Sequence, residues 1–335
     1  MDSALRNRCL LSLDDVSDQE MVRLVTLAFE LKAKKRAGMR GDLLLGRNVA
    51  MVFEKSSTRT RCAVAVAAAD EGAHTEYLAS HEIHLGKKES VADTARVLGR
   101  MFDGVMYRGY SQRTVELLAE HAGVPVWNGL TDDEHPTQAL ADLMTVRETF
   151  GRLKDLKLVY VGDGRNNVVN SLMAACAKCG MHFVNCTPKD LFPDPSRVEA
   201  ARTAADRNGG SIEVVEDPAE ALPGANAVYT DVWVSMGEED QKEERMRLLK
   251  PYQVNMEMMN HTGHVNDGKV IFLHCLPAFH DDQTAVTAKT GAMEVTDDVF
   301  ESDFSKVFDQ AENRMHTIKA IMIATVTGRL HAASL

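Results

Sequence analysis

The stretch NVAMVFEKSSTRTRCAVAVAAADEG, residues 48–72, decides how the chain is expected to fold. Residues 48–53 are apolar after the first position and have the length of a buried strand. Residues 61–71 are rich in alanine, which favours helix, and Gly72 suits a helix end. A strand followed by a helix predicts one unit of an α/β fold with parallel strands.

The same alternation runs along the rest of the chain. Further strands are expected at residues 75–79, 102–109, 124–129, 156–164, 182–188, 212–217, 226–233, 270–277 and 305–310. A long helix at 135–151 separates two such series. They predict two doubly wound parallel-sheet domains, residues 1–148 and 149–310, with a substrate crevice between them. A last amphipathic helix, 311–333, is expected to pack back on the first domain.

Composition and charge narrow the class of protein. Of 335 residues, 44% are apolar and 26% are charged, as in ordinary globular proteins. The formal net charge of −11 opposes broad attraction to nucleic acid, which needs lysine and arginine. No apolar stretch reaches the roughly 20 residues that span a bilayer, and residues 1–15 lack a secretory signal pattern. We expect a cytoplasmic protein without a nucleic-acid or membrane partner.

The six cysteines show no disulfide framework, which fits a reducing compartment. Cys176 and Cys179 form a C-x-x-C pair, but their surroundings have the apolar spacing of a helix and no second pair accompanies them. Structural zinc sites use a full set of ligands. The sequence therefore predicts no metal site.

SSTRT, residues 56–60, occupies the turn between a strand and a helix. Backbone N–H groups and the positive end of the helix dipole point at whatever binds there. Ser57, Thr58 and Thr60 add hydroxyl groups, and Arg59 adds a planar cation suited to phosphate oxygens. A single Ser-Thr pair would be only a helix cap. Four such side chains together favour an anion site.

Other polar side chains follow the strands of the first half. Arg108 ends an apolar strand, which indicates either a ligand contact or a surface ion pair. His135 and Gln138 flank a proline suited to a first helical turn, so both could face one ligand. Together they offer a donor for a carbonyl oxygen and an acceptor for an amide. His84 lies in a basic loop, HLGKKES, that is more typical of a solvated surface.

GDGRNN, residues 162–167, raises a nicotinamide-dependent oxidoreductase as a rival hypothesis. The dinucleotide fingerprint needs a third glycine where Asn167 stands. The next strand ends in Val184, Asn185 and Cys186 instead of the acidic residue that binds a ribose. Both failures count against this hypothesis and leave Asn167 as a polar group facing the crevice.

Two later loops suit an amino acid. TDVWVSMGEE places Asp231 at a strand end before a Ser-Met-Gly turn, and FLHCLPAFH ends a strand at His274 and Cys275. A carboxylate matches an ammonium group, and free backbone groups match a carboxylate. Cys275 could act as a covalent nucleophile, but no His-Asp arrangement is readable beside it, so a noncovalent role is favoured.

The stretches FEKSSTRTR, YRGY, HPTQ, GDGRNN, DVWVSMGE, HCLPAFHDDQT and DQAENRMHT resemble ornithine carbamoyltransferases. The resemblance runs from about residue 8 to the final helix. It implies transfer of a carbamoyl group from carbamoyl phosphate to the side-chain amine of L-ornithine, giving citrulline and phosphate without a metal or organic cofactor. It also implies at least a homotrimer. A putrescine or other amine carbamoyltransferase stays open as an alternative, as does a noncatalytic regulator, and both directions of the reversible reaction stay open.

The resemblance also implies a role for each matching residue. Carbamoyl phosphate would be held by Ser57, Thr58, Arg59, Thr60, His84, Arg108, His135, Gln138, Cys275, Leu276 and Arg314. Ornithine would be held by Asn167, Asp231, Ser235, Met236, Cys275 and Leu276. The catalytic residues would be Arg59, Arg108, His135, Asp231 and Cys275. His84 departs from the family pattern, because a glutamine commonly occupies its position, in several members reaching a neighbouring subunit's site.

Overall fold

The computed structural model describes residues 5–234 and 239–332. The chain divides into two compact units, Met1–Met144 with Glu312–Leu335, and Thr145–Ala311. The divisions fall inside two helices, α5 (Pro136–Phe150) and α12 (Val307–Thr327). No helix of the described residues is long and apolar enough to cross a membrane.

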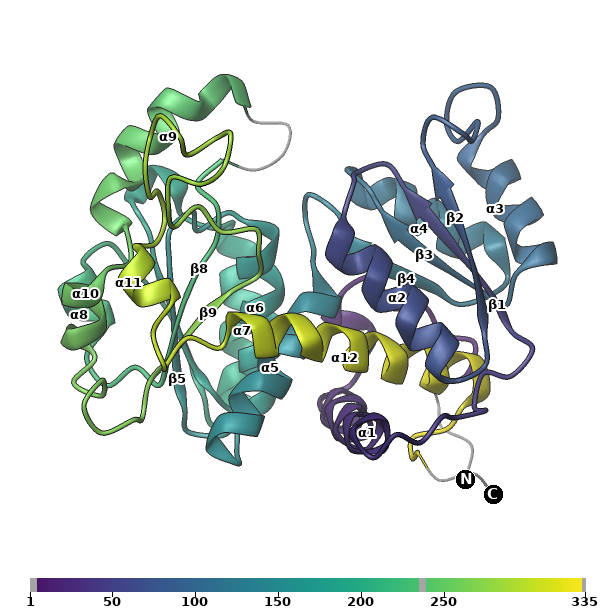
Figure 1. The fold of residues 1–335 in the computed structure, drawn as a ribbon, viewed down its shortest axis with the longest axis horizontal. Helices are drawn as coiled ribbons and strands as arrows, with labels where there is room; N and C mark the ends of the chain where they lie inside the picture. Colours follow the sequence, from purple (N-terminus) through teal and green to yellow (C-terminus); the bar gives the residue numbers. More distant parts are fainter. Residues whose placement is uncertain (1–4, 235–238, 333–335) are drawn as a thin grey trace. The chain divides into compact units, whose positions relative to one another are not determined.

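The first unit is built on a four-stranded parallel sheet with the order β2-β1-β3-β4. Side chains of Ala50, Val52, Val105 and Tyr107 share one apolar cluster with residues of α3 and α4, and Figure 1 shows these two helices beside the sheet. Before α5 and α12 its elements are η1 (Leu13–Asp15), α1 (Asp18–Arg36), β1 (Asn48–Phe53), α2 (Thr58–Asp70), β2 (His74–Ala79), α3 (Val91–Met101), β3 (Gly104–Arg108), α4 (Gln112–Ala122) and β4 (Val126–Leu130).

The second unit is built on a five-stranded parallel sheet with the order β7-β6-β5-β8-β9. Its strands are β5 (Lys157–Val161), β6 (His182–Cys186), β7 (Ser211–Val215), β8 (Ala227–Thr230) and β9 (Ile271–His274). Its remaining elements are α6 (Asn167–Cys179), η2 (Lys189–Leu191), α7 (Pro195–Asn208), α8 (Pro218–Ala221), η3 (Glu239–Gln241), α9 (Lys242–Leu249), η4 (Lys250–Tyr252), α10 (Met256–His261) and α11 (Asp297–Phe300).

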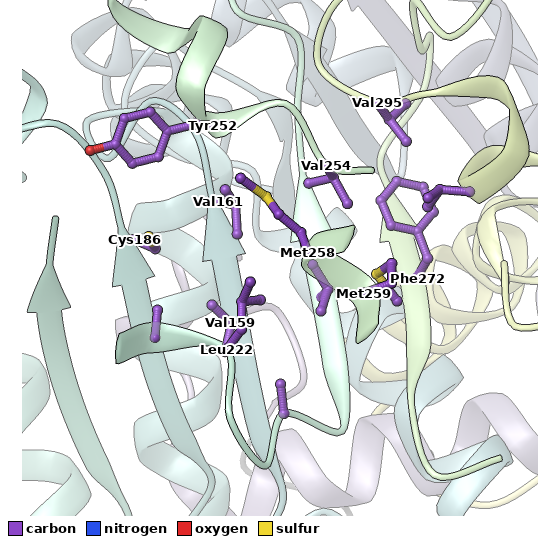
Figure 2. Close-up of a cluster of buried hydrophobic side chains, with 14 of the residues drawn as sticks. Val159, Val161, Cys186, Leu222, Tyr252, Val254, Met258, Met259, Phe272 and Val295 are labelled. Carbon is purple, nitrogen blue, oxygen red and sulfur yellow. The ribbon is translucent and has the colours of Figure 1, made fainter. Parts of the chain in front are cut away.

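One face of the second sheet carries a large apolar core. Figure 2 shows Val159, Val161 and Phe272 on the strands meeting Leu222, Met258 and Met259 from the covering segments. All except Met258 are at most 2% exposed. Such burial is worth roughly 1.5–3 kcal/mol for each large side chain before the loss of entropy is counted. This packing holds the strand ends that carry the polar residues.

Both sheets confirm the predicted α/β class, and nine of the ten expected strands are present. The strand expected at 305–310 is wrong, because α12 begins at Val307. Val307, Gln310 and Asn313 are buried while Phe308 is 65% exposed, which is helical spacing. Only Ser305 retains strand character, in a single bridge to Phe272. A short apolar run does not by itself separate strand from helix.

The last helix ends at Thr327, six residues before the expected limit. Its C-terminal part is bound to the first unit by polar contacts. Trp127 Nε1 donates to Thr325 Oγ1 at 2.9 Å, and Lys319 Nζ donates to Asp70 Oδ2 at 2.6 Å. Both Trp127 and Lys319 are at most 1% exposed. Residues from the end of the chain therefore belong to the unit that begins it.

Candidate active site

The polar residues of the first unit gather where the strand order reverses. β1 and β3 are neighbours in the sheet. From β1 the chain continues to β2 on one side, and from β3 it continues to β4 on the other side. SSTRT follows β1, and Arg108 is the last residue of β3. In open α/β sheets, ligands bind at this switch point, outside the carboxyl ends of the strands. The sheet therefore brings Arg108 to the loop that the sequence predicts as an anion site.

Ser57 is the N-cap of α2, and its Oγ accepts a hydrogen bond from Thr60 N at 3.1 Å. The cap and the anion site are compatible, because capping satisfies one backbone N–H and leaves the helix dipole in place. Thr58 and Arg59 form the first turn of α2. The side chain of Thr58 is exposed, and that of Arg59 is partly buried.

Thr60 joins two arginines that are far apart in the sequence. Its Oγ1 accepts from Arg314 Nη2 at 2.9 Å and from Arg108 Nη1 at 3.5 Å. Thr60 is fully buried, and the arginines are 3% and 8% exposed. Two buried guanidinium groups at one hydroxyl make a strongly positive environment, since burial strengthens electrostatic interactions. The structure thus brings together Thr60, Arg108 and Arg314, and their binding of carbamoyl phosphate stays a prediction.

His135 lies directly before α5 and is 3% exposed. Burial lowers the pKa of its imidazole well below the usual value, and the positive charges of Arg314, Arg108 and Arg59 lower it further. The ring is therefore neutral at pH 7, with one N–H to donate. That state suits a donor to a carbonyl oxygen.

Gln138, in the first turn of α5, is 1% exposed. Its Nε2 donates to Asp142 Oδ1 at 2.7 Å, and a carboxylate acceptor sets the orientation of the amide. Its Oε1 is buried and has no hydrogen-bond partner in the described part of the chain. A buried acceptor of this kind is costly unless a ligand satisfies it. Gln138 therefore offers a site for an N–H donor.

The second unit repeats the arrangement at its own switch point, between β5 and β8. Asp231 follows β8, and its Oδ2 accepts from Asn166 Nδ2 at 2.9 Å. Sequence reasoning named Asn167, the first residue of α6, and missed Asn166, the residue that caps this helix. An asparagine directly before a helix is a capping signal that could have found it. The role of Asn167 stays a prediction.

Cys275 follows β9 and donates its thiol hydrogen to Asp231 Oδ1 at 3.0 Å. The same oxygen accepts from Val232 N at 2.8 Å. The 6% exposed carboxylate of Asp231 therefore has donors on both oxygens. A thiol held as a donor to a carboxylate is not activated as a thiolate, because a nearby negative charge disfavours that form. The geometry favours a noncovalent role for Cys275.

The loop after β9 is held by a buried pair, His274 and Glu294, both 0% exposed. His274 Nε2 lies 3.2 Å from Glu294 Oε1, and His274 Nδ1 accepts from Leu276 N at 2.9 Å. Since Nδ1 accepts, the proton is on Nε2 and points at the carboxylate. These contacts hold Leu276 at a φ of 58°, a conformation that leucine rarely adopts.

Asp231, His274 and Cys275 also place one possible metal-ligating atom each within 4.8 Å of one another. The contacts above engage both ring nitrogens of His274, the thiol and both carboxylate oxygens. A metal ion held by one atom of each residue would compete with the hydrogen bonds that those atoms make. The arrangement is therefore complete as a hydrogen-bonded unit.

A second polar contact in the same unit was also missed from sequence. Arg245 on α9 forms a buried ion pair with Asp163, which belongs to the loop after β5. The two side chains are 4% and 8% exposed. Removing one partner of such a pair leaves an uncompensated buried charge. The pair ties α9 to the loop that ends in Asn166.

One predicted site residue, His84, has no described contact to these clusters, and two others are not described. Ser235 and Met236 lie outside the described residues. His84 is exposed, and its backbone carbonyl accepts from Lys87 N at 2.9 Å. No hydrogen bond or ion pair in residues 5–234 and 239–332 joins its ring to Ser57–Thr60.

The fold and these clusters define a two-unit α/β protein with a cluster of buried arginines at one switch point and a carboxylate–thiol cluster at the other. Two family models match the chain: the aspartate/ornithine carbamoyltransferase carbamoyl-P binding domain over residues 8–148, and the Asp/Orn binding domain over residues 154–325. The chain belongs to the aspartate/ornithine carbamoyltransferase family.

Relatives and solved structures of this family cover nearly the whole chain. A catabolic ornithine carbamoyltransferase from Bacillus licheniformis is 57% identical over 96% of this chain and 97% of its own length. One from Enterococcus faecalis is 54% identical over 97% and 98%. The structure of ornithine carbamoyltransferase from Pyrococcus furiosus superposes with a TM-score of 0.90 at 43% identity, covering 98% of this chain and 100% of that one.

Proposed function

We infer that the chain is an ornithine carbamoyltransferase, which transfers the carbamoyl group of carbamoyl phosphate to the side-chain amine of L-ornithine. The observation that carries this inference is identity of 54–57% with curated ornithine carbamoyltransferases along essentially the full length. The polar clusters at both switch points supply chemistry of the kind that the reaction needs. The products are L-citrulline and phosphate.

We assign carbamoyl phosphate to the first predicted domain, residues 1–148 with the returning C-terminal helix. Arg59, the hydroxyls of Ser57, Thr58 and Thr60, and the α2 N-terminus would bind the phosphate. Arg108, Arg314 and the neutral His135 would donate to the carbamoyl oxygen. Gln138 Oε1, which has no described partner, would accept from the carbamoyl NH₂ group.

We assign ornithine to residues 149–310. Asp231 would bind an ammonium group, and Asn167, Ser235 and Met236 would complete the binding of the amino-acid end. Cys275 and Leu276 follow β9 and would contact both substrates. Cys275 would act without a covalent intermediate, because its thiol is a hydrogen-bond donor to Asp231.

The chemistry follows from charge. An amine like that of ornithine titrates near 10.4, so only a minor fraction is nucleophilic at pH 7. Its nitrogen attacks the carbamoyl carbon, and negative charge develops on the carbamoyl oxygen. Preorganised donors stabilise this charge more than they stabilise the ground state. The bond from carbon to the phosphate oxygen then breaks, and the proton lost by the amine can leave on the phosphate.

The direct test is citrulline formation from carbamoyl phosphate and ornithine by the purified chain. Putrescine, which lacks a carboxylate, and aspartate, which lacks the distal amine, are the matched comparison substrates. Robust turnover of either one without ornithine turnover would overturn the assignment. Saturable nicotinamide binding in a fluorescence titration would instead revive the oxidoreductase hypothesis.

We further propose that the chain works in the citrulline-consuming direction, because the relatives cited above are named catabolic. Citrulline with inorganic phosphate should then yield detectable ornithine in an assay that removes the carbamoyl phosphate as it forms. We also propose a homotrimer or a multiple of trimers, which light scattering of the purified protein would test. We also propose a cytoplasmic location, because the sequence shows no disulfide framework of the kind that secreted proteins use.

A further inference from the structure

Lys55 directly precedes the SSTRT segment, and its side chain is 5% exposed. A buried ammonium group is costly unless it is paired. Its Nζ lies 2.5 Å from Asp132 Oδ1 and 4.3 Å from the centroid of the Tyr110 ring. Both distances fit real interactions, an ion pair and a cation–π contact. None of the roles assigned above uses this lysine.

The partners of Lys55 lie on two other loops of the first unit. Lys55 belongs to the loop between β1 and α2, Tyr110 to the loop between β3 and α4, and Asp132 to the loop between β4 and α5. These three segments adjoin the residues assigned to carbamoyl phosphate. Ser57 follows Lys55, Arg108 precedes Tyr110, and His135 follows Asp132.

Backbone hydrogen bonds join the same three loops. Glu54 N donates to Arg108 O at 2.8 Å, and Lys55 N donates to the same oxygen at 3.4 Å. Asp132 N donates to Tyr110 O at 2.8 Å. The first two bonds connect the first loop to the last residue of β3, directly before the second loop, and the last bond connects the second loop to the third. The Lys55–Asp132 pair adds a direct link between the first loop and the third.

We propose that Lys55 is a positioning residue that, through Asp132 and Tyr110, holds the three loops of the carbamoyl phosphate site in register. The proposal rests on the proposed function for the identity of the ligand. Misplacement of binding groups by about 1 Å can cost roughly a hundredfold in rate, so loops that carry separate contacts to one small ligand need such a link.

Direct binding of phosphate by Lys55 is the alternative to a positioning role, and the two roles predict opposite effects of Asp132→Asn. If the ammonium acted by attracting phosphate, removal of the competing Asp132 carboxylate would strengthen binding, because a nearby negative charge opposes the anion. If Lys55 acts by holding the loops, removal of that carboxylate weakens binding. The sign of the Asp132→Asn effect therefore separates the two roles.

The experiment measures KM for carbamoyl phosphate and for ornithine in Lys55→Met, Asp132→Asn and the double variant. We expect each single variant to raise KM for carbamoyl phosphate, by roughly 10- to 100-fold for Lys55→Met. KM for ornithine should change little. The double variant should lose less than the product of the single losses, because both changes break one link. Lys35→Met, which removes a lysine paired with Asp70 at 2.7 Å, is the matched control.

Unfolding midpoints of all variants accompany the kinetics. A lower KM for carbamoyl phosphate in Asp132→Asn would overturn the proposal, as would equal rises in both KM values with a matching loss of stability. If Lys55→Met does not fold, Asp132→Asn and Tyr110→Leu carry the test. Absence of citrulline formation by the unaltered protein would contradict the proposed function instead. In that case, calorimetric titration with inorganic phosphate tests the link between the loops. Phosphate should bind more weakly to Lys55→Met and Asp132→Asn than to the unaltered protein.

Discussion

The hydroxyl of Thr60 accepts a hydrogen bond from Arg314 Nη2 at 2.9 Å, across 254 positions of sequence. Arg108 Nη1 lies 3.5 Å from the same oxygen. One buried hydroxyl therefore orients two cations that come from β3 and from the last helix. The SSTRT segment is thus contacted by a side chain from the last helix of the sequence.

This relationship predicts the effect of removing the hydroxyl. Thr60→Val keeps the shape of the side chain and leaves buried guanidinium donors without their acceptor. We expect kcat/KM for carbamoyl phosphate to fall by about 10- to 150-fold, the range of a hydrogen bond to a charged group. Thr60→Ser keeps the hydroxyl and should retain most activity. Equal losses in both variants, measured by citrulline formation, would contradict the hydrogen-bonding role.

Arg59 and Lys87 should differ sharply. Arg59 lies in the first turn of α2, where its guanidinium can pair with phosphate, whereas Lys87 lies in an exposed loop. We expect Arg59→Ala to lower kcat/KM by about 10- to 150-fold. Lys87→Ala should cost far less, since exposed charges contribute little. Equal losses in the same assay would refute this ranking.

Cys275→Ala tests the noncovalent role of the thiol. We expect measurable citrulline formation with a raised KM for ornithine, because the Asp231 carboxylate loses one of its donors. Cys275→Ser should lose less than Cys275→Ala, since a hydroxyl can still donate. Complete loss of turnover in both variants, with folding intact by circular dichroism, would support covalent catalysis instead.

Stability should fall as the pH is lowered from 7 toward 5. Burial lowers the pKa of His135 well below 6.5 and, as the largest of several effects, lowers the pKa of His316 to about 4. In the unfolded chain both histidines titrate near 6.5, so the unfolded state binds more protons below that pH. Each histidine can contribute up to about 1.4 kcal/mol of lost stability per pH unit.

Urea unfolding at pH 7, 6 and 5 measures this slope. His316→Gln should flatten it, because one of the two groups no longer takes up a proton on unfolding. A stability that rises between pH 7 and pH 5 would be inconsistent with the lowered pKa values.

His84 stands where the family commonly has a glutamine, and both side chains can donate a hydrogen bond. We expect His84→Gln to leave KM for carbamoyl phosphate nearly unchanged, because the exposed ring has no described contact to Ser57–Thr60. A large change in KM, measured by citrulline formation, would show that the difference from the family's common glutamine matters.

Local sequence patterns determined much of this molecule. The apolar run before SSTRT and the alanine-rich segment after it were enough to predict β1 and α2, because strand and helix formation follow local periodicity and propensity. The same reasoning failed at residues 305–310, where the apolar run was too short to separate helix from strand. Ser57 could be predicted as a cap because capping involves residues three positions apart.

Only the tertiary structure decided which distant side chains share a site. Asn166 meets Asp231 from 65 positions away, and Lys55 meets Asp132 from 77 positions away. No local sequence pattern predicts either contact, because each depends on how the strands are ordered in a sheet and where their loops end. The sequence by itself determined the helices and strands and their capping. Sheet order and long-range packing determined which polar side chains lie next to one another. The physical reason is that buried polar groups need partners that only the folded chain supplies.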